Sequence, residues 1–394
     1  MDTPLRIRIS RPEDLLAHLP YRLGFRPRDS VVLLGLRGRG MPVGLVSRVD
    51  LPDVAHPVVG PRLLRDIDEL MAADGSSDVL VVLYSDLPRS RLAADPVVRG
   101  ALDHLRALTD WADPPGPWVV GARTYGCWGE REECEPSERD VAELEHSPVA
   151  ATMVLHGATV AADRAMLAVP RGTDSTRRRA AGRAAREARR TLAAVRARSG
   201  GGAADPGAAF GRPGAVPAAG QEEMVAWRTG EWRRWHRLLV LARQEAQLPA
   251  PELGRLAVGL EDHAVRDGVL CSVIRPAPPE VPGPGLVART LDLAMLPGGP
   301  PPEPARLEAA GTVLRAVVSC VPSSSAALAL GLLAWMAWWS ADGARADVLA
   351  QQALRARPGT RLAELVVDAL DARLAPGWVH SSVGGGTAAE APIR

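Results

Sequence analysis

The chain has 394 residues, of which 46% are apolar and 24% charged, an ordinary mixture for a globular protein of two or three domains. It contains no lysine and no asparagine, so all 47 basic residues are arginine, and 46 acidic residues leave a net charge of +1. General polyanion binders usually carry a clear basic excess, so this balance argues against that class. Chemistry that needs a lysine amine, such as Schiff-base formation, is excluded.

The patterns that would place the chain in a membrane or in an oxidising compartment are missing from the sequence. Residues 1–9 alternate apolar and charged side chains, unlike a secretion signal. The most apolar segment, 326–339, has 14 residues, whereas a membrane-spanning helix needs about 20. Four cysteines are too few for a disulfide scaffold. We therefore expect a cytoplasmic protein that does not bind a membrane.

The first part of the chain, residues 1–170, predicts an α/β domain. A strand is expected over 5–10. Pro12 and two acids then begin a helix that ends near Gly24, because proline and acidic residues favour a first helical turn. Two β-branched runs, 31–36 and 43–49, are separated by six residues, which suits a hairpin and is too short for a crossover helix. At least one strand pair should therefore be antiparallel.

The rest of this domain alternates helical and strand patterns. A helix is expected over 61–73, and it leads into a nearly continuous apolar strand at 78–84. Another strand is expected at 118–123 and a further helix at 147–162. We therefore predict a mixed sheet that is covered by helices.

A different composition begins after residue 170. Residues 171–198 hold ten arginines against Asp174 and Glu187 in an alanine-rich, helix-favouring stretch. Residues 199–220 are mostly Gly, Ala and Pro, so 171–220 is interpreted as an Arg-rich helix followed by a disordered linker. We expect 221–380 to form an α-helical domain and 381–394 a disordered tail.

The helical domain contains one pattern that is similar to a single tetratricopeptide-type helical hairpin, over about 325–358. Small residues at Ala346 and Ala353 allow two helices to approach closely, and Asp342 and Gly343 predict the turn between them. One copy does not make an array, because a solenoid needs roughly three repeats. We therefore predict a helix pair within an all-α domain.

Several segments together resemble a known family. The sequence DLLAHLPYRLGFRP at 14–27, DSVVL at 29–33 and RVDLP at 48–52 look like the amino-terminal signature of the actinobacterial domain of unknown function 4192 (DUF4192) family. The run LGLLAW at 330–335 resembles the carboxy-terminal part of that family. The resemblance implies the two-part layout and no reaction. The family often carries a Cys, a spacer and Cys-Cys-Pro, of which Cys127 and Cys134 remain here.

Cys127 and Cys134, with His146 and His156 downstream, are the one candidate set of metal ligands. Structural zinc sites usually take two cysteine pairs with two to four residues between the members of each pair. Here six residues separate the cysteines and no second pair follows. Ordinary loop cysteines are therefore the favoured interpretation, and no metal or cofactor is expected.

The best candidates for a ligand site follow the strands of the α/β domain. Ligands of such sheets collect beyond the ends of parallel strands. Arg48 and Asp50 close the second hairpin strand, and Ser85 and Asp86 follow the strand at 78–84. They could recognise an anionic or hydroxylated ligand, although a structural ion pair is favoured. No GxSxG, GxxxxGK[ST], HExxH or strand-linked GxGxxG motif is present, so no catalytic residues are identified and enzyme activity is disfavoured.

The candidate partner-binding residues lie in the helical domain. Trp232 and Trp235 are flanked by Arg233, Arg234 and His236, which would make complete burial costly, so these tryptophans are expected to line a groove. The working hypothesis is a non-catalytic binding or regulatory protein that docks a protein partner through its helical domain. The alternative is a small-ligand binder or enzyme acting at the strand ends. Nucleic-acid association through residues 177–198 is a third, disfavoured option.

Overall fold

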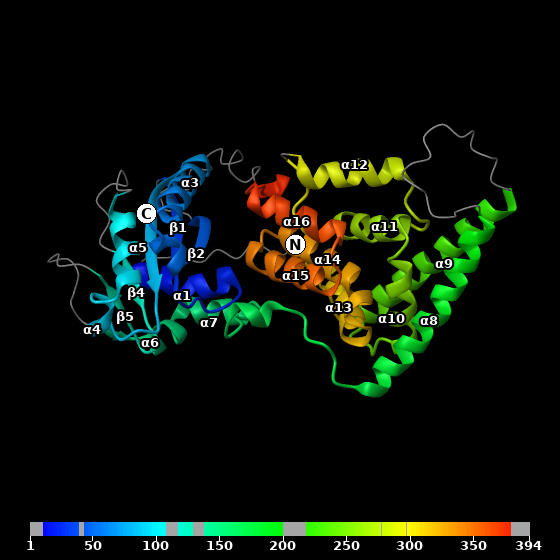
Figure 1. Cartoon of the computed structure of the whole chain (residues 1–394), viewed down its shortest axis with the longest axis horizontal. Helices are drawn as coiled ribbons and strands as arrows, with labels where there is room; N and C mark the ends of the chain where they lie inside the picture. The colour runs from blue at the N-terminus through cyan, green and yellow to red at the C-terminus, as the bar shows by residue number, and fades with distance from the viewer. Residues whose placement is uncertain are drawn as a thin grey trace, which may run out of the picture. The chain divides into compact units, whose positions relative to one another are not determined.

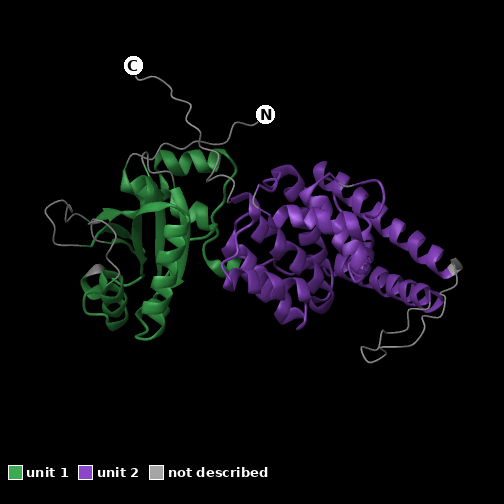
Figure 2. Cartoon of the chain, turned by 90° about the horizontal axis from the view of Figure 1, so that it is seen from above, with its two compact units in different colours: residues 1–166 green, residues 167–394 purple. Residues whose placement is uncertain are grey.

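The structure is a computed structural model of two compact units, residues 1–166 and 167–394 (Figure 2). The structure describes residues 11–38, 43–107, 117–128, 138–199, 218–276, 278–296 and 298–379. The strand predicted at 5–10 and the tail at 381–394 lie outside them.

The first unit is built on a six-stranded mixed sheet with the strand order β2-β1-β3-β4-β5-β6. Its strands are β1 (Ser30–Arg37), β2 (Val43–Asp50), β3 (Ser76–Tyr84), β4 (Trp118–Val120), β5 (Thr124–Cys127) and β6 (Arg139–Asp140). β1 and β2 form the predicted antiparallel hairpin, with Val31 opposite Val49. Only β3 and β4 are parallel among the described strands. The fold is therefore α+β, and the predicted strand at 118–123 ends at Val120, where the chain turns back into β5.

Both faces of the sheet are covered at β1, whose apolar residues are buried without alternation. On one face, Val31 and Leu33 pack with Leu64, Ile67 and other buried side chains. The helices of this unit are α1 (Pro12–Leu23), α2 (Leu51–Ala55), α3 (Val59–Ala73), α4 (Arg89–Leu92), α5 (Pro96–Ala107), α6 (Val141–Glu145) and α7 (Pro148–Leu155). The predicted helix at 147–162 is shorter than expected, since α7 ends at Leu155.

The described residues of the second unit form helices joined by loops, with no strand among them (Figure 1). Its helices are α8 (Ser175–Arg198), α9 (Ala218–Arg243), α10 (Ala250–Gly259), α11 (His263–Ile274), α12 (Pro284–Met295), α13 (Pro304–Cys320), α14 (Ser323–Trp339), α15 (Gly343–Ala356) and α16 (Arg361–Asp371). α14 is buried along nearly its whole length, which explains its apolar sequence. No helix among the described residues combines the length and apolarity needed to cross a membrane.

The predicted helical hairpin is formed by α14 and α15. Ala346, Ala350 and Ala353 are fully buried, so the small side chains allow the close helix approach that the sequence predicts. The carboxylate of Asp342 accepts a hydrogen bond from the Arg345 N–H at 3.0 Å and so caps α15.

The Arg-rich stretch is an ordered helix, α8, and its inner face packs on α10. Ala181 and Ala185 are buried there. Gly254 on α10 lies so close that a Cβ at this position would overlap the carbonyl oxygen of Ala181. α9 begins at Ala218, so residues 218–220 are helical and do not belong to the linker as expected. The remainder of the predicted linker, 200–217, lies outside the described residues.

Candidate functional site

The predicted ligand residues of the first unit lie at one edge of the sheet, but each of them is already engaged by another group of the protein. Register places Ser30 opposite Asp50 on one side and opposite Tyr84 on the other, so β2 and β3 end at the same edge. Arg48 Nη2 lies 2.6 Å from Asp50 Oδ1. The same nitrogen donates a hydrogen bond to the carbonyl oxygen of Arg28 at 3.4 Å. Arg48 is therefore held in a structural ion pair.

Ser85 and Asp86 also lie at this edge, but they do not form a ligand site. Ser85 is 2% exposed. Its hydroxyl oxygen accepts the N–H of Leu87 at 3.3 Å, which closes the turn after β3. Asp86 lies 3.9 Å from the guanidinium of Arg28. Arg28, which sequence reasoning missed, thus links both candidate pairs through its backbone and its side chain.

Three polar atoms near this edge are buried without a hydrogen-bond partner in the described structure: Ser30 Oγ, Arg48 Nε and Tyr84 Oη. Burial raises the pKa of the Tyr84 hydroxyl far above its ordinary value. This tyrosine therefore stays protonated and cannot act as a base near neutral pH.

The two predicted partner-binding tryptophans are core residues, so the expectation that they line a groove is wrong. Trp232 and Trp235 are both 0% exposed. Trp232 Nε1–H donates to the carbonyl oxygen of Pro278 at 3.0 Å, and Trp235 Nε1–H donates to the hydroxyl of Ser272 at 3.0 Å. Both polar atoms are satisfied internally, so complete burial carries no penalty here.

The candidate metal ligands do not assemble in the described residues. Cys127 is disulfide-bonded, so it is neither a free loop thiol nor a thiolate ligand. The Nδ1 atoms of His146 and His156 lie 2.6 and 2.9 Å from carbonyl oxygens of their own chain segments. Within the ranges that the structure describes, no three His, Cys, Asp or Glu side chains are grouped to hold a metal ion. Cys134 lies outside those ranges.

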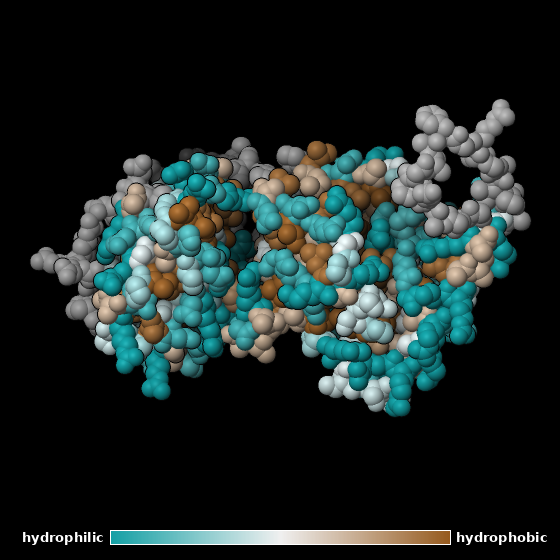
Figure 3. Space-filling model, viewed as in Figure 1, coloured by the Kyte–Doolittle hydropathy of each residue, from teal (hydrophilic) through white to brown (hydrophobic). Residues whose placement is uncertain are grey.

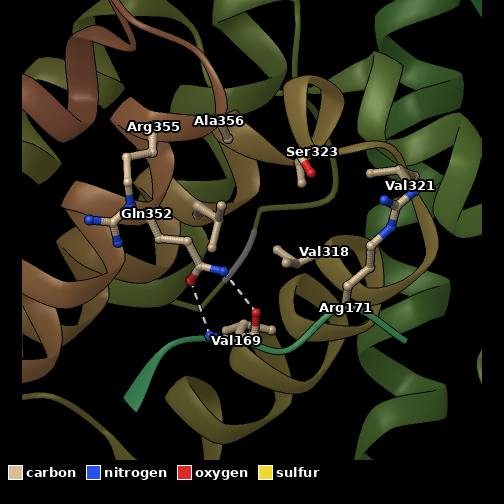
Figure 4. A pocket seen from close by; sticks show the side chains of 10 residues that line it. Val169, Arg171, Val318, Val321, Ser323, Gln352, Arg355 and Ala356 are labelled. Carbon is tan, nitrogen blue, oxygen red and sulfur yellow. Dashed lines mark hydrogen bonds between the residues drawn. The ribbon is translucent and has the colours of Figure 1, made fainter. Parts of the chain in front are cut away.

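The helical unit contains a cavity of about 260 Å³ that sequence reasoning did not anticipate (Figure 4). It lies where the chain entering α8, the junction of α13 and α14, and the last turn of α15 meet. The lining residues are Val169, Arg171, Val318, Val321, Ser323, Ala326, Leu330, Gln352, Arg355 and Ala356.

The segment that forms one wall of the cavity is fixed by hydrogen bonds at two points. The side-chain amide of Gln352 accepts the N–H of Val169 at 3.0 Å and donates to the Val169 carbonyl at 2.8 Å (Figure 4). The second point lies between Arg171 and Thr173, where the N–H of Gly172 donates a hydrogen bond to the carbonyl oxygen of Ser319 at 3.0 Å. This wall of the cavity is therefore held in place by hydrogen bonds, which lowers the ordering cost of binding.

The cavity combines an apolar lining with the start of a long helix. Val169, Val318, Val321 and Leu330 are buried and supply the apolar surface. α14 begins at Ser323, and its N-cap residue Pro322 makes no side-chain capping bond. The first N–H groups of a helix have no acceptor within the helix, and the helix dipole makes this end partially positive.

Two exposed arginines at the rim give the cavity its charge. Arg171 and Arg355 lie on different sides of Gln352 (Figure 4). Neither makes an ion pair or a side-chain hydrogen bond with any residue that the structure describes, and none of the ten lining residues is acidic. A free guanidinium binds carboxylates and phosphates through two parallel N–H donors. The arrangement suits a small anion.

The match to known proteins extends over both units. A family model described as a domain of unknown function, DUF4192, matches residues 12–377. The chain belongs to the DUF4192 family. The family membership predicted from the sequence motifs is thus confirmed, and its description names no reaction or ligand for a DUF4192 protein. No curated protein and no solved structure matches the chain.

The cavity of this DUF4192 chain was missed because its residues come from distant segments. Weak signals were present in the sequence. Pro322 followed by three serines is typical of a helix start, and Gln352 and Arg355 are three residues apart on one helix face. Nothing in the pattern predicts that Arg171 lies beside them.

Proposed function

We propose that this protein is a non-catalytic binding protein whose helical unit takes up a small anion, a carboxylate or a phosphate ester with a short apolar body. One observation carries the proposal: two guanidiniums without partners in the described structure border a cavity that has an apolar lining and no acidic residue. Concave apolar surface with few polar groups is the usual composition of a ligand site. At about 260 Å³, the cavity is below the roughly 300–1,000 Å³ of drug-sized sites, so the ligand is small.

The roles of the lining residues follow from their chemistry. Arg171 and Arg355 would bind the anionic group, and the hydroxyl of Ser323 with the first N–H groups of α14 would add neutral donors. The buried valines would contact the apolar body. Gln352 would position Arg171 by holding Val169, since its amide is already used in that clamp.

A ligand site or an active site at the strand ends of the first unit is less well supported. Arg48 is occupied by Asp50 and a backbone carbonyl, and Ser85 is buried in a turn. A ligand would have to displace these contacts before it gained any of its own. The strand-end hypothesis stays a prediction.

The experiment is a thermal-shift titration with butyrate, ethyl phosphate and inorganic phosphate, with butanol as the uncharged comparison. Ligands that bind only the folded state raise Tm with concentration. We expect the acids to raise Tm and butanol to have no effect. Arg171→Ala and Arg355→Ala should each weaken binding about tenfold, the loss typical of a charge-assisted hydrogen bond.

Two further variants separate the site from general charge effects. Arg233→Ala removes an exposed arginine that has no partner among the described residues and does not line the cavity, so it should bind the acids normally. Ala356→Leu leaves the charges in place and fills the cavity, so it should weaken binding. If the double variant of Arg171 and Arg355 responds to the acids as the wild type does, the proposal is wrong.

A further inference from the structure

The outer face of α8 carries four exposed arginines in one line: Arg179, Arg183, Arg186 and Arg190, here called the arginine stripe. Their spacing of four, three and four residues places them on the same side of the helix. At 1.5 Å per residue the stripe is about 16 Å long. The opposite side of α8 is the buried one, and it consists of Ala181, Ala184, Ala185, Leu192 and Val195.

The fold leaves this stripe without counter-charges but pairs two other arginines of α8 with acids. Arg189 Nη2 lies 2.6 Å from Glu261 Oε1, and Arg198 Nη2 lies 2.6 Å from Glu223 Oε1. In the described structure, by contrast, no acid lies within ion-pair distance of any stripe residue. Arg179 only donates to groups of its own helix, at 3.3 Å to a carbonyl and 3.5 Å to a hydroxyl.

The one acidic side chain on α8 does not compensate the stripe. Glu187 Oε2 lies 3.7 Å from Arg255 Nη2 on α10. It is therefore directed toward the neighbouring helix. The surface over this part of the second unit is strongly hydrophilic (Figure 3).

Beyond the stripe, the same outer face continues with small side chains. Ala193, Ala194 and Ala197 are all exposed. Alanines allow a second helix to approach closely, since interaxial distances of 8–10 Å depend on the side chains at the contact. One helix face thus offers a charged half followed by a half with little steric bulk.

We propose that the arginine stripe and the following alanines dock an acidic α-helix of a partner protein, whose carboxylates repeat at intervals of four and three residues. The charge is complementary, and the spacing matches that of a helix laid along α8. The docking face is preorganised, because Asp174 caps α8 and the close contact of Gly254 with Ala181 fixes it on α10.

Several observations favour a protein helix over nucleic acid as the occupant. α8 has no aromatic residue on which a base could stack, and the chain has a net charge of only +1. The alanine half offers no contact to a phosphate backbone, whereas it suits a packed helix.

The test uses fluorescence anisotropy with the full chain and a synthetic 21-residue helical peptide whose glutamates follow the spacing of four, three and four. A peptide of the same composition with shuffled glutamates is the comparison, and a 24-base-pair DNA duplex probes the other occupant. We expect the ordered peptide to bind about tenfold more tightly than the shuffled one. The triple variant Arg183→Glu, Arg186→Glu and Arg190→Glu should lose at least this factor, because several weak ion pairs become repulsions.

The control carries the same change of charge elsewhere on the second unit. Arg233, Arg243 and Arg275 are exposed and have no partner among the described residues, so their triple change to glutamate should alter binding no more than about twofold, mainly through long-range charge. Ala194→Trp should weaken the ordered peptide without a change of charge. Equal binding of the two peptides, equal loss in both triple variants, or tighter binding of the duplex would each overturn the proposal.

Discussion

Two carboxylates that share one arginine have opposite pKa shifts. Glu231 on α9 is buried, and its Oε2 atom has no hydrogen-bond partner in the described structure. Burial raises its pKa, and the ion pair with Arg234 offsets only part of that effect. Burial also acts on Glu252, but Arg234 and Arg255 outweigh it and hold the pKa of Glu252 below its ordinary value. The difference lies in solvent access and in the number of arginine partners.

These shifts predict opposite pH dependences for Glu231→Gln and Glu252→Gln. The folded state holds the Glu231 proton more tightly than the unfolded state does, so wild-type stability falls as pH rises from 4.5 through the folded pKa. Relative to wild type, Glu231→Gln should therefore gain stability between pH 4.5 and 7. The Tm of Glu231→Gln, measured relative to that of the wild type, should therefore rise with pH above 4.5.

Glu252 provides the matched comparison. Its lowered pKa stabilises the fold above pH 4.5, and that contribution is lost as pH falls through the folded pKa. The loss of stability caused by Glu252→Gln should therefore be largest near pH 7 and should become smaller as the pH falls. Thermal unfolding between pH 4 and 7 measures both trends. If the stability of both variants relative to wild type changed in the same direction with pH, the assigned pKa directions would be wrong.

The tryptophans show what the sequence could not predict at this scale. Trp232 and Trp235 are one helical turn apart and face the core, while the charged neighbours Arg233 and Arg237 face outward. Adjacent helix positions point about 100° apart, so flanking charges say little about exposure. The acceptors, Ser272 and the carbonyl oxygen of Pro278, come from a later helix and the loop after it, which local sequence does not reveal.

At the scale of elements, the local sequence pattern predicted the β1–β2 hairpin and the α14–α15 pair, because only a few residues join the two members of each pair. The cavity has no such local origin. It depends on the segment at Val169 reaching α15, and nothing near Val169 encodes Gln352. The same reasoning applies to the sheet edge, where Arg48 and Asp50 were found as a pair but their link to Arg28 was not.

The α8–α10 contact gives a prediction at this scale. Because a Cβ on Gly254 would overlap the backbone of Ala181, Gly254→Ala must push the two helices apart. We expect a loss of about 2 kcal/mol in the free energy of unfolding, as is typical of overpacking. Urea denaturation of the full chain measures it.

Gly230→Ala is the control on α9. No atom lies within 4 Å of a Cβ built at Gly230, and the position is exposed. Replacing a helical glycine by alanine stabilises by about 0.5–1 kcal/mol, so this variant should be more stable than wild type. If Gly254→Ala also stabilises the chain, the close approach of α8 to α10 is wrong. The preorganisation of the arginine stripe would then lose its basis.

At the scale of the whole molecule, the family model matches residues 12–377 and so covers most of both units, whose boundary follows Met166. The second unit has its own extensive core, which includes α14 and the buried tryptophans. Seven of the ten tryptophans belong to it: Trp227, Trp232, Trp235, Trp335, Trp338, Trp339 and Trp378. Most of the tryptophan fluorescence therefore reports on the unfolding of the second unit.

We expect a fragment of residues 167–394 to fold on its own and to unfold cooperatively, within about 2 °C of the corresponding transition of the full chain, because a core of this size suffices for an independent domain. A shorter fragment that begins at residue 175 lacks Val169 and Arg171, so it loses the Gln352 clamp and one of the two cavity arginines. It should keep its helical circular dichroism, melt at a lower temperature and fail to respond to ethyl phosphate. If the fragment 167–394 shows no cooperative transition, the helical unit depends on the first 166 residues. A shorter one that still binds the anion would remove Arg171 from the site.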